Sequence, residues 1–337
     1  MKEKGNNLEA SLKSLDTEEF LDIHFYRPVG YQWARFFQRL GVTPNTITIL
    51  SIFLGIGAGI CFYFQDFGIT LLGIFLLIWA NTYDSADGQL ARLTGQKSEL
   101  GRILDGASGD LWFISIYIAI CLRLMPEQIP TFLTDLFGCN SQPWGFTIFI
   151  LAILAGLAHS QQACMADYYR NIHLFFLKGK AGSELDHASL QEKIYKELSF
   201  SKQPVRKTFQ YFYKGYTRKQ EKRSPQCQEF FSYIKQYYGD EATKLAPENY
   251  GLPADLLPEW VRADFRKGSL PLMKYCNILT FNTRAIVLSL SLLVGEPWFY
   301  FAFELTILLA LYLYLVHAHE KLCRKLTIKI KNKAKQA

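Results

Sequence analysis

Residues 84–110 read DSADGQLARLTGQKSELGRILDGASGD, and long apolar runs flank this acidic stretch on both sides. Its four aspartates, at the ends of segments long enough to cross a membrane, are Asp84, Asp87, Asp105 and Asp110. Carboxylates in such positions are costly unless a cation, an ionic partner or water accompanies them. The stretch therefore predicts a membrane fold with a polar site at its edge.

Helical spacing gathers the polar and small residues of this stretch on one face. A continuous stripe at positions i, i+3, i+4, i+7 and i+8 of a helix is formed by Asp84, Asp87, Gly88, Ala91 and Arg92. Gly101 and Asp105 are likewise one turn apart. Two helices that turn carboxylates toward each other make a hard-oxygen site of the kind that Mg²⁺ prefers.

This pattern resembles the signature of the CDP-alcohol phosphotransferase family, D-x2-D-G-x2-A-R-x8-G-x3-D-x3-D. Every element from Asp84 to Asp105 fits it, including the eight residues before Gly101. The last aspartate is displaced, because the signature places it at Gly109 and this chain has Asp110 instead. A weaker similarity to the start of the family's first membrane helix lies in residues 43–48, TPNTIT.

The resemblance implies an integral membrane enzyme that transfers a phosphoryl-alcohol from a CDP-alcohol to an acceptor hydroxyl and releases CMP. It implies Mg²⁺, for which Mn²⁺ can substitute, held by Asp84, Asp87, Asp105 and Asp110, with Asp110 as the general base. The matching positions assigned to substrate binding are Asn45, Gly88, Ala91, Arg92 and Gly101. Family members are commonly dimers, so a homodimer is a further implication.

The residue types also fit this chemistry without the family. A diphosphate is polyanionic and will not approach clustered aspartates unless divalent cations lie between them. Arg92 could add positive charge on the phosphates. One carboxylate must remain outside full metal ligation to accept the proton of the attacking hydroxyl.

The displaced aspartate predicts a local irregularity. On a regular helix position 109 lies about 40° from Asp105, whereas Asp110 lies about 140° away. A π-bulge would absorb the extra residue, and Gly106 and Gly109 would make it easier. We therefore predict a bulge or an unwound turn between Asp105 and Asp110.

The apolar runs predict an all-α integral membrane protein. Six transmembrane helices are expected at about residues 46–64, 67–92, 107–124, 144–166, 278–293 and 298–317. The domains expected are a lead and interfacial helix (1–45), helices one to four (46–166), a helical cytoplasmic insert (167–276), helices five and six (277–320) and a basic tail (321–337).

The segments outside these helices differ in character. Residues 1–20 are predicted to be a polar, mobile lead without the apolar core of a signal peptide. Residues 25–40 are aromatic and basic, which suits a helix in the membrane interface that ends at Gly41. The alternative is that this helix forms a wall of the active site. Breaks at proline and glycine divide the insert into helices near 189–198, 204–219, 226–238 and 253–266.

The basic residues predict the orientation in the membrane. The chain carries a net charge of +7, and its Lys and Arg residues cluster at the termini, after Arg92 and in the insert. The turns at 65–66, 126–143 and 295–297 carry none. We therefore expect cytoplasmic termini and a cytoplasmic site, as in a bacterial inner membrane, with lipid headgroups rather than nucleic acid as the anionic partner.

Further polar residues lie in or beside the apolar runs. Arg170 follows the fourth run and is a candidate for binding an acceptor phosphate, and Arg284 in the fifth run is a second candidate. Glu304 in the sixth run is a candidate counter-ion for Arg284. His159 is interpreted as an interhelical histidine, and the seven scattered cysteines as small apolar packing residues.

Several functions remain open on these residues. The expected reaction joins a CDP-activated lipid to inositol, inositol phosphate or a similar polyol in phospholipid or sphingolipid synthesis. The reverse arrangement, a CDP-headgroup with a lipid alcohol such as diacylglycerol or ceramide, needs the same motif. An intramembrane prenyltransferase is an alternative because residues 81–84, NTYD, resemble its first motif faintly. A divalent-cation transporter is another, although no internal hydropathy repeat is visible.

Overall fold

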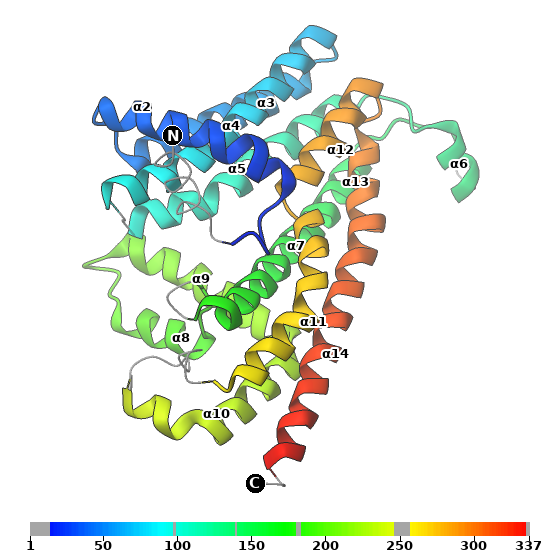
Figure 1. Cartoon of the computed structure of the whole chain (residues 1–337). Coiled ribbons are helices and arrows are strands. Elements are labelled where there is room, and N and C mark those ends of the chain that lie inside the picture. Colours follow the sequence, from blue (N-terminus) through cyan, green and yellow to red (C-terminus); the bar gives the residue numbers. More distant parts are fainter. Residues whose placement is uncertain (1–13, 97–98, 139, 180–182, 246–256, 335–337) are drawn as a thin grey trace. The chain divides into compact units, whose positions relative to one another are not determined.

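The computed structural model describes residues 14–96, 99–138, 140–179, 183–245 and 257–334 (Figure 1). These residues form helices and contain no strand beyond an isolated bridge between Gln128 and Pro143. Within them, six helical segments are long and apolar enough to cross a membrane: Pro44–Tyr63, Phe67–Thr94, Leu104–Leu124, Thr147–Lys178, Glu259–Val294 and Trp298–Lys333. The prediction of an all-α membrane protein with six spanning helices is confirmed.

The chain divides into two compact units, one formed mainly by residues 18–159 and 281–307 and the other mainly by residues 160–280 and 308–337. The first unit holds η1 (Asp22–Tyr26), α2 (Arg27–Arg39), α3 (Pro44–Tyr63), α4 (Phe67–Thr94), α5 (Glu99–Leu124), α6 (Thr131–Phe137), the first part of α7 (Thr147–Lys178), α12 (Phe281–Val294), α13 (Trp298–Phe303) and most of η4 (Glu304–Leu308).

Capping residues fix the ends of the helices in the first unit. Gly41 follows α2 with a φ of 69°, a left-handed conformation that glycine adopts without strain. Thr43 caps α3 by accepting a hydrogen bond from the backbone N–H of Thr46 at 3.4 Å. Asp66 caps α4 in the same way through Ile69, at 2.9 Å, and Gly95 ends α4 with a φ of 71°. The caps predicted at Gly41 and Thr43 are confirmed.

Small residues of α3 let it pack closely against α5. A Cβ atom built on Gly55 would lie 2.0 Å from the Trp112 ring, and one on Gly59 would lie 2.3 Å from Ser115 Oγ. Gly55 and Gly59 form a G-x3-G spacing, which permits close approach of helices in membranes. This contact holds α5 beside α3, and it thereby positions the start of α5.

Substituting Gly55 is expected to disrupt this contact. Gly55→Ala should lower the free energy of unfolding by about 1–3 kcal/mol, because the new methyl group overlaps the Trp112 ring. Gly57→Ala is the matched control, since its Cβ would meet only Leu76, at 3.6 Å. Thermal unfolding in detergent compares the two, and equal stability would contradict the packing described.

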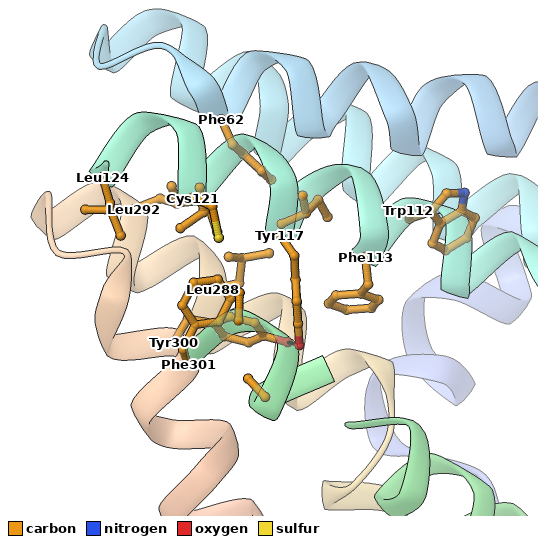
Figure 2. Close-up of a cluster of buried hydrophobic side chains, with 14 of the residues drawn as sticks. Phe62, Trp112, Phe113, Tyr117, Cys121, Leu124, Leu288, Leu292, Tyr300 and Phe301 are labelled. Atoms are coloured by element: carbon orange, nitrogen blue, oxygen red, sulfur yellow. Dashed lines mark hydrogen bonds between the residues drawn. The ribbon is translucent and has the colours of Figure 1, made fainter. Parts of the chain in front are cut away.

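The core of the first unit is formed by α3, α4, α5, α7, α12 and α13 and is rich in aromatic side chains (Figure 2). Phe62, Trp112, Leu288 and Phe301 are at most 2% exposed. By contrast, large apolar side chains such as Phe53 are exposed on the outer faces of the spanning helices. Apolar surface of this extent is typical of contact with lipid.

The second unit contains the end of α7, α8 (Ala188–Glu197), α9 (Pro204–Arg223), α10 (Pro225–Leu245), α11 (Glu259–Ile278) and α14 (Leu309–Ala334). Its core includes stacked rings, with Phe176 and Phe265 at 4.0 Å between centroids. The predicted helices of the insert are confirmed at α8, α9 and α10. The start predicted at residue 253 lies outside the described residues. Within them the fourth helix is α11, Glu259–Ile278, which continues past the predicted end at 266.

Two predicted boundaries fall within ordered elements. The boundary at residue 167 lies inside α7, which continues without a break to Lys178 and buries Tyr169 and Phe176 beyond its apolar run. Residues 14–20 of the predicted polar lead make contacts with the rest of the chain. Within the second unit Asp16 accepts hydrogen bonds from Arg266 at 3.0 Å and lies 3.3 Å from His173 Nε2.

Candidate metal centre

Two helices of the first unit bring three of the predicted aspartates together. Asp84 and Asp87 lie on the last three turns of α4, and Asp105 lies on the second turn of α5. One carboxylate oxygen from each of the three lies within 4.8 Å of the others. Asp87 is 3% exposed, Asp84 is partly buried and Asp105 is exposed, so the group is closed on the α4 side and open at Asp105.

Neighbouring hydroxyl groups orient two of these carboxylates. Thr48 of α3 donates a hydrogen bond to Asp87 Oδ2 at 2.5 Å. Ser108 of α5 lies 2.8 Å from Asp84 Oδ1 and can donate to it. Outer hydrogen bonds of this kind fix the direction of metal-binding carboxylates. The sequence analysis missed Ser108, and it missed Thr48 although residues 43–48 had been singled out.

Thr48→Val is expected to weaken binding of a divalent cation about 10–100-fold while the helices stay folded, because Asp87 loses its orienting donor. Thr48→Ser retains the hydroxyl and should retain most of the affinity. Titration of the purified variants with Mn²⁺ compares the two. A valine variant with the affinity of the wild type would contradict the orienting role.

Two arginines lie near the acidic group. Arg92 interacts electrostatically with Asp87 and Asp105, and its predicted contact with phosphates stays a prediction. Arg27 of α2 interacts with Asp84 and is held by Glu18, whose carboxylate lies 3.3 Å from the guanidinium. The sequence analysis considered this helix as a wall of the active site but did not single out Arg27.

Small residues of the motif leave room beside the carboxylates. A Cβ atom built on Gly106 or Gly109 would meet no atom within 4 Å, and one on Gly88 would lie 3.7 Å from Arg92 Nη1. Ala91 is partly buried on α4, and Gly101 is partly buried one turn before Asp105. A ligand could therefore approach the backbone of α5 closely.

The bulge predicted between Asp105 and Asp110 is wrong. The α-helix is unbroken from Glu99 to Leu124, so Asp110 stays on a different side of α5 from Asp105. Asp110 is absent from the group of carboxylates that approach within 4.8 Å. The glycines at 106 and 109 fit a regular helix, and the sequence signal for irregularity was only the displaced spacing.

The other predicted site residues have different surroundings. Asn45 lies partly buried on the first turn of α3. Arg284 is fully buried in the first unit, and its Nε donates to Glu304 Oε1 at 2.8 Å, which confirms Glu304 as its counter-ion. Arg170 belongs to the second unit, so its contact with an acceptor phosphate stays a prediction.

The ion pair of Arg284 and Glu304 belongs to a buried polar network. Glu304 also accepts from Tyr300 at 2.7 Å and lies 3.6 Å from His159 Nδ1. Tyr117 of α5 is 3.2 Å from the same histidine nitrogen. The interpretation of His159 as an interhelical histidine is confirmed, and its network satisfies the charge of Arg284 inside the apolar core.

The acidic group fits a hard divalent cation. Its donors are carboxylate oxygens, their mutual distances allow shared ligation, and like charges this close need a cation to remain together. The fold and this group define the class as an integral membrane protein with a carboxylate group able to hold a metal ion on two adjacent spanning helices.

Comparison with known proteins finds one matching family. Residues 41–174 match the model of the CDP-alcohol phosphatidyltransferase family. The matched region contains α3, α4 and α5 and thus all three clustered aspartates. The family resemblance predicted from residues 84–110 is confirmed.

Two curated proteins are similar to the chain. One is the archaetidylinositol phosphate synthase of Pyrococcus horikoshii, 39% identical over 95 residues, which are 28% of this chain and 49% of that protein. The other is an uncharacterized protein of Aquifex aeolicus, 35% identical over 81 residues, 24% of this chain and 40% of the relative. The chain thus spans half or less of the length of the curated relatives it matches.

Proposed function

We propose that the protein transfers a phosphoryl-alcohol from a CDP-alcohol to an acceptor hydroxyl, with release of CMP and dependence on Mg²⁺. The observation that carries this proposal is the convergence of Asp84, Asp87 and Asp105 from two adjacent membrane helices. The family match and the two nearby arginines support it. A transporter would not need positive charge beside its carboxylates.

Different residues of the chain would bind the metal ion, orient its ligands and supply positive charge. Asp84, Asp87 and Asp105 would hold the divalent ion, while Thr48 and Ser108 keep two of these carboxylates in place. When bound, the ion would neutralise the diphosphate and ease the departure of CMP. Arg92 and Arg27 add fixed positive charge on the side where phosphate oxygens would lie.

We propose a CDP-activated lipid as the donor and a polyol of the inositol class as the acceptor. An apolar groove between α3 and α5 supports the lipid donor, since its lining includes Ile56, Ile60, Leu111 and Ile114 and the same two helices carry Thr48 and Asp105. The name of the similar Pyrococcus protein, an archaetidylinositol phosphate synthase, supports the acceptor class.

Purified protein in detergent with Mg²⁺ tests the proposal. CMP release from CDP-diacylglycerol should require an added acceptor, and the panel should include inositol, inositol 1-phosphate and glycerol 3-phosphate. CDP-headgroups with diacylglycerol or ceramide form the second arm. No CMP from any donor, together with Mg²⁺ uptake by vesicles containing the protein, would replace the enzyme with a transporter.

We also propose that both termini and the aspartates face the cytoplasm. The support is the distribution of Lys and Arg, which are absent from the turns at 65–66, 126–143 and 295–297. A reporter fused after Ala337 should be active only in the cytoplasm. An extracytoplasmic reporter signal would reverse this orientation.

A further inference from the structure

The second unit contains a separate cluster of metal-ligating side chains. Cys227 lies in α10, and His319 and Cys323 lie in α14. One ligand atom from each of the three lies within 4.8 Å of the others, and none of the three residues is exposed to solvent. The proposed transferase reaction uses none of them.

Local structure explains why these side chains meet. His319 and Cys323 are four residues apart, so they lie on one face of α14. Within the second unit α10 packs along α14, which brings the first turn of α10 to this face (Figure 1). Glu320 accepts hydrogen bonds from the backbone N–H groups of Gln226, at 2.7 Å, and Cys227, at 3.3 Å. These bonds place Cys227 opposite the other two.

The distances agree with metal coordination. Cys323 Sγ lies 3.7 Å from His319 Nδ1. In a tetrahedral zinc site, a thiolate sulfur and an imidazole nitrogen are separated by about 3.6 Å. The thiols of Cys227 and Cys323 also interact directly. All three donors could therefore bind one ion with little movement.

Hydrogen bonding alone accounts poorly for the histidine. His319 stacks on Tyr169 at 3.9 Å between ring centroids, and among the described residues its buried Nε2 has no hydrogen-bond partner. Its other nitrogen meets only the weakly hydrogen-bonding thiol of Cys323. Buried polar groups usually have better partners, and metal ligation at Nδ1 would supply one for that nitrogen, though not for Nε2.

We propose that Cys227, His319 and Cys323 bind Zn²⁺, which fastens α10 to α14 within the second unit. Thiolate and imidazole donors select zinc over magnesium, in contrast to the carboxylates of the first unit. The two centres should therefore hold different metals. The ion would tie the two helices together, because its three protein donors are buried and come from α10 and α14. The fourth position of the zinc ion would then be taken by water.

Metal analysis of the full chain tests this proposal. Protein purified in detergent with excess Mg²⁺ should retain about one zinc ion per chain. Cys227→Ser and Cys323→Ser should each reduce this content at least about tenfold, because each removes a thiolate ligand. Cys121→Ser, a buried cysteine of the first unit, and Asp84→Asn should both leave it unchanged.

Cobalt gives a second readout that does not depend on the variants folding. Replacing zinc by Co²⁺ in the wild type should produce thiolate-to-cobalt charge-transfer absorption in the near ultraviolet, which carboxylate ligands cannot give. Zinc content below about a tenth per chain with no such absorption under reducing conditions would overturn the proposal. Zinc that persists in folded Cys227→Ser and Cys323→Ser would overturn it as well.

Discussion

Asp87→Asn is expected to lower the rate of CMP release at least about 1,000-fold, because the buried carboxylate is central to the metal centre. Asp87 is almost fully buried and accepts a hydrogen bond from Thr48. One of its carboxylate oxygens lies within 4.8 Å of an oxygen of Asp84 and of Asp105. An amide has the same shape but no charge to offset a divalent cation. Rates at increasing Mg²⁺ should show no recovery.

Measurements of stability show whether Asp87→Asn has lost metal binding or has failed to fold. Three carboxylates close together repel one another without a cation, so metal-free Asp87→Asn should be at least as stable as the metal-free wild type. Mg²⁺ at 100 times its dissociation constant should stabilise the wild type by about 2.7 kcal/mol and the variant far less. Thermal unfolding with and without Mg²⁺ measures both.

Asp110→Asn is the matched control from the same motif. Because α5 is regular and Asp110 lies outside the carboxylate group, this variant should keep at least about a third of the wild-type rate. A loss as large as that of Asp87→Asn would restore Asp110 as the general base and contradict our interpretation of the helix. Full activity in Asp87→Asn would remove the metal centre.

Arg284→Met is expected to destabilise the protein by about 3–5 kcal/mol, because it leaves the buried carboxylate of Glu304 without its cation. Arg284 and Glu304 are both fully buried, and their atoms are 2.8 Å apart. The measurement is the unfolding temperature in detergent, followed by size-exclusion chromatography. Glu304→Gln should be similarly harmful, since it strands the guanidinium instead.

The double variant decides whether charge is the cause. Arg284→Met with Glu304→Gln removes both charges and should recover most of the lost stability, because no unpaired ion remains. Lys274→Met, an exposed cation of the same spanning segment, is the control and should change stability by less than about 0.5 kcal/mol. Additive losses in the double variant would show that the pair is not coupled.

Most of the correct predictions rest on the length of the apolar runs and on the fixed spacing of the motif residues. The six spans follow from runs of apolar residues, and the group of Asp84, Asp87 and Asp105 follows from helical spacing on two neighbouring helices. The pairing of Arg284 with Glu304 could be anticipated because opposite charges within membrane segments seek each other.

The errors came from features that spacing does not determine. The ends of α7 and α14 lie beyond their apolar runs, because amphipathic residues continue each helix past its apolar part. The predicted bulge failed because a displaced aspartate does not require a distorted helix. The π-turns instead occur at residues 22–26 and 304–308, where no motif indicated them.

Contacts between distant residues were also hidden in the sequence. Thr48 and Ser108 reach aspartates 39 and 24 residues away, and such pairs emerge only when helices pack. The cluster of Cys227 with His319 and Cys323 had one usable signal, the four-residue spacing of a histidine and a cysteine on a helix. It was passed over because isolated cysteines usually fill apolar space.

The packing of α2 against α4 gives the bilayer itself an influence on the reaction. Gly30 lies against Ser85 and Ala86, and Gln89 donates to the carbonyl oxygen of Arg27 at 3.1 Å, so the amphipathic helix and the acidic helix meet beside the aspartates. A helix of this composition settles at a depth set by headgroup charge and lateral pressure. Any change in that depth would shift the Arg27 charge relative to Asp84, so the rate should vary with the lipids in which the protein is reconstituted.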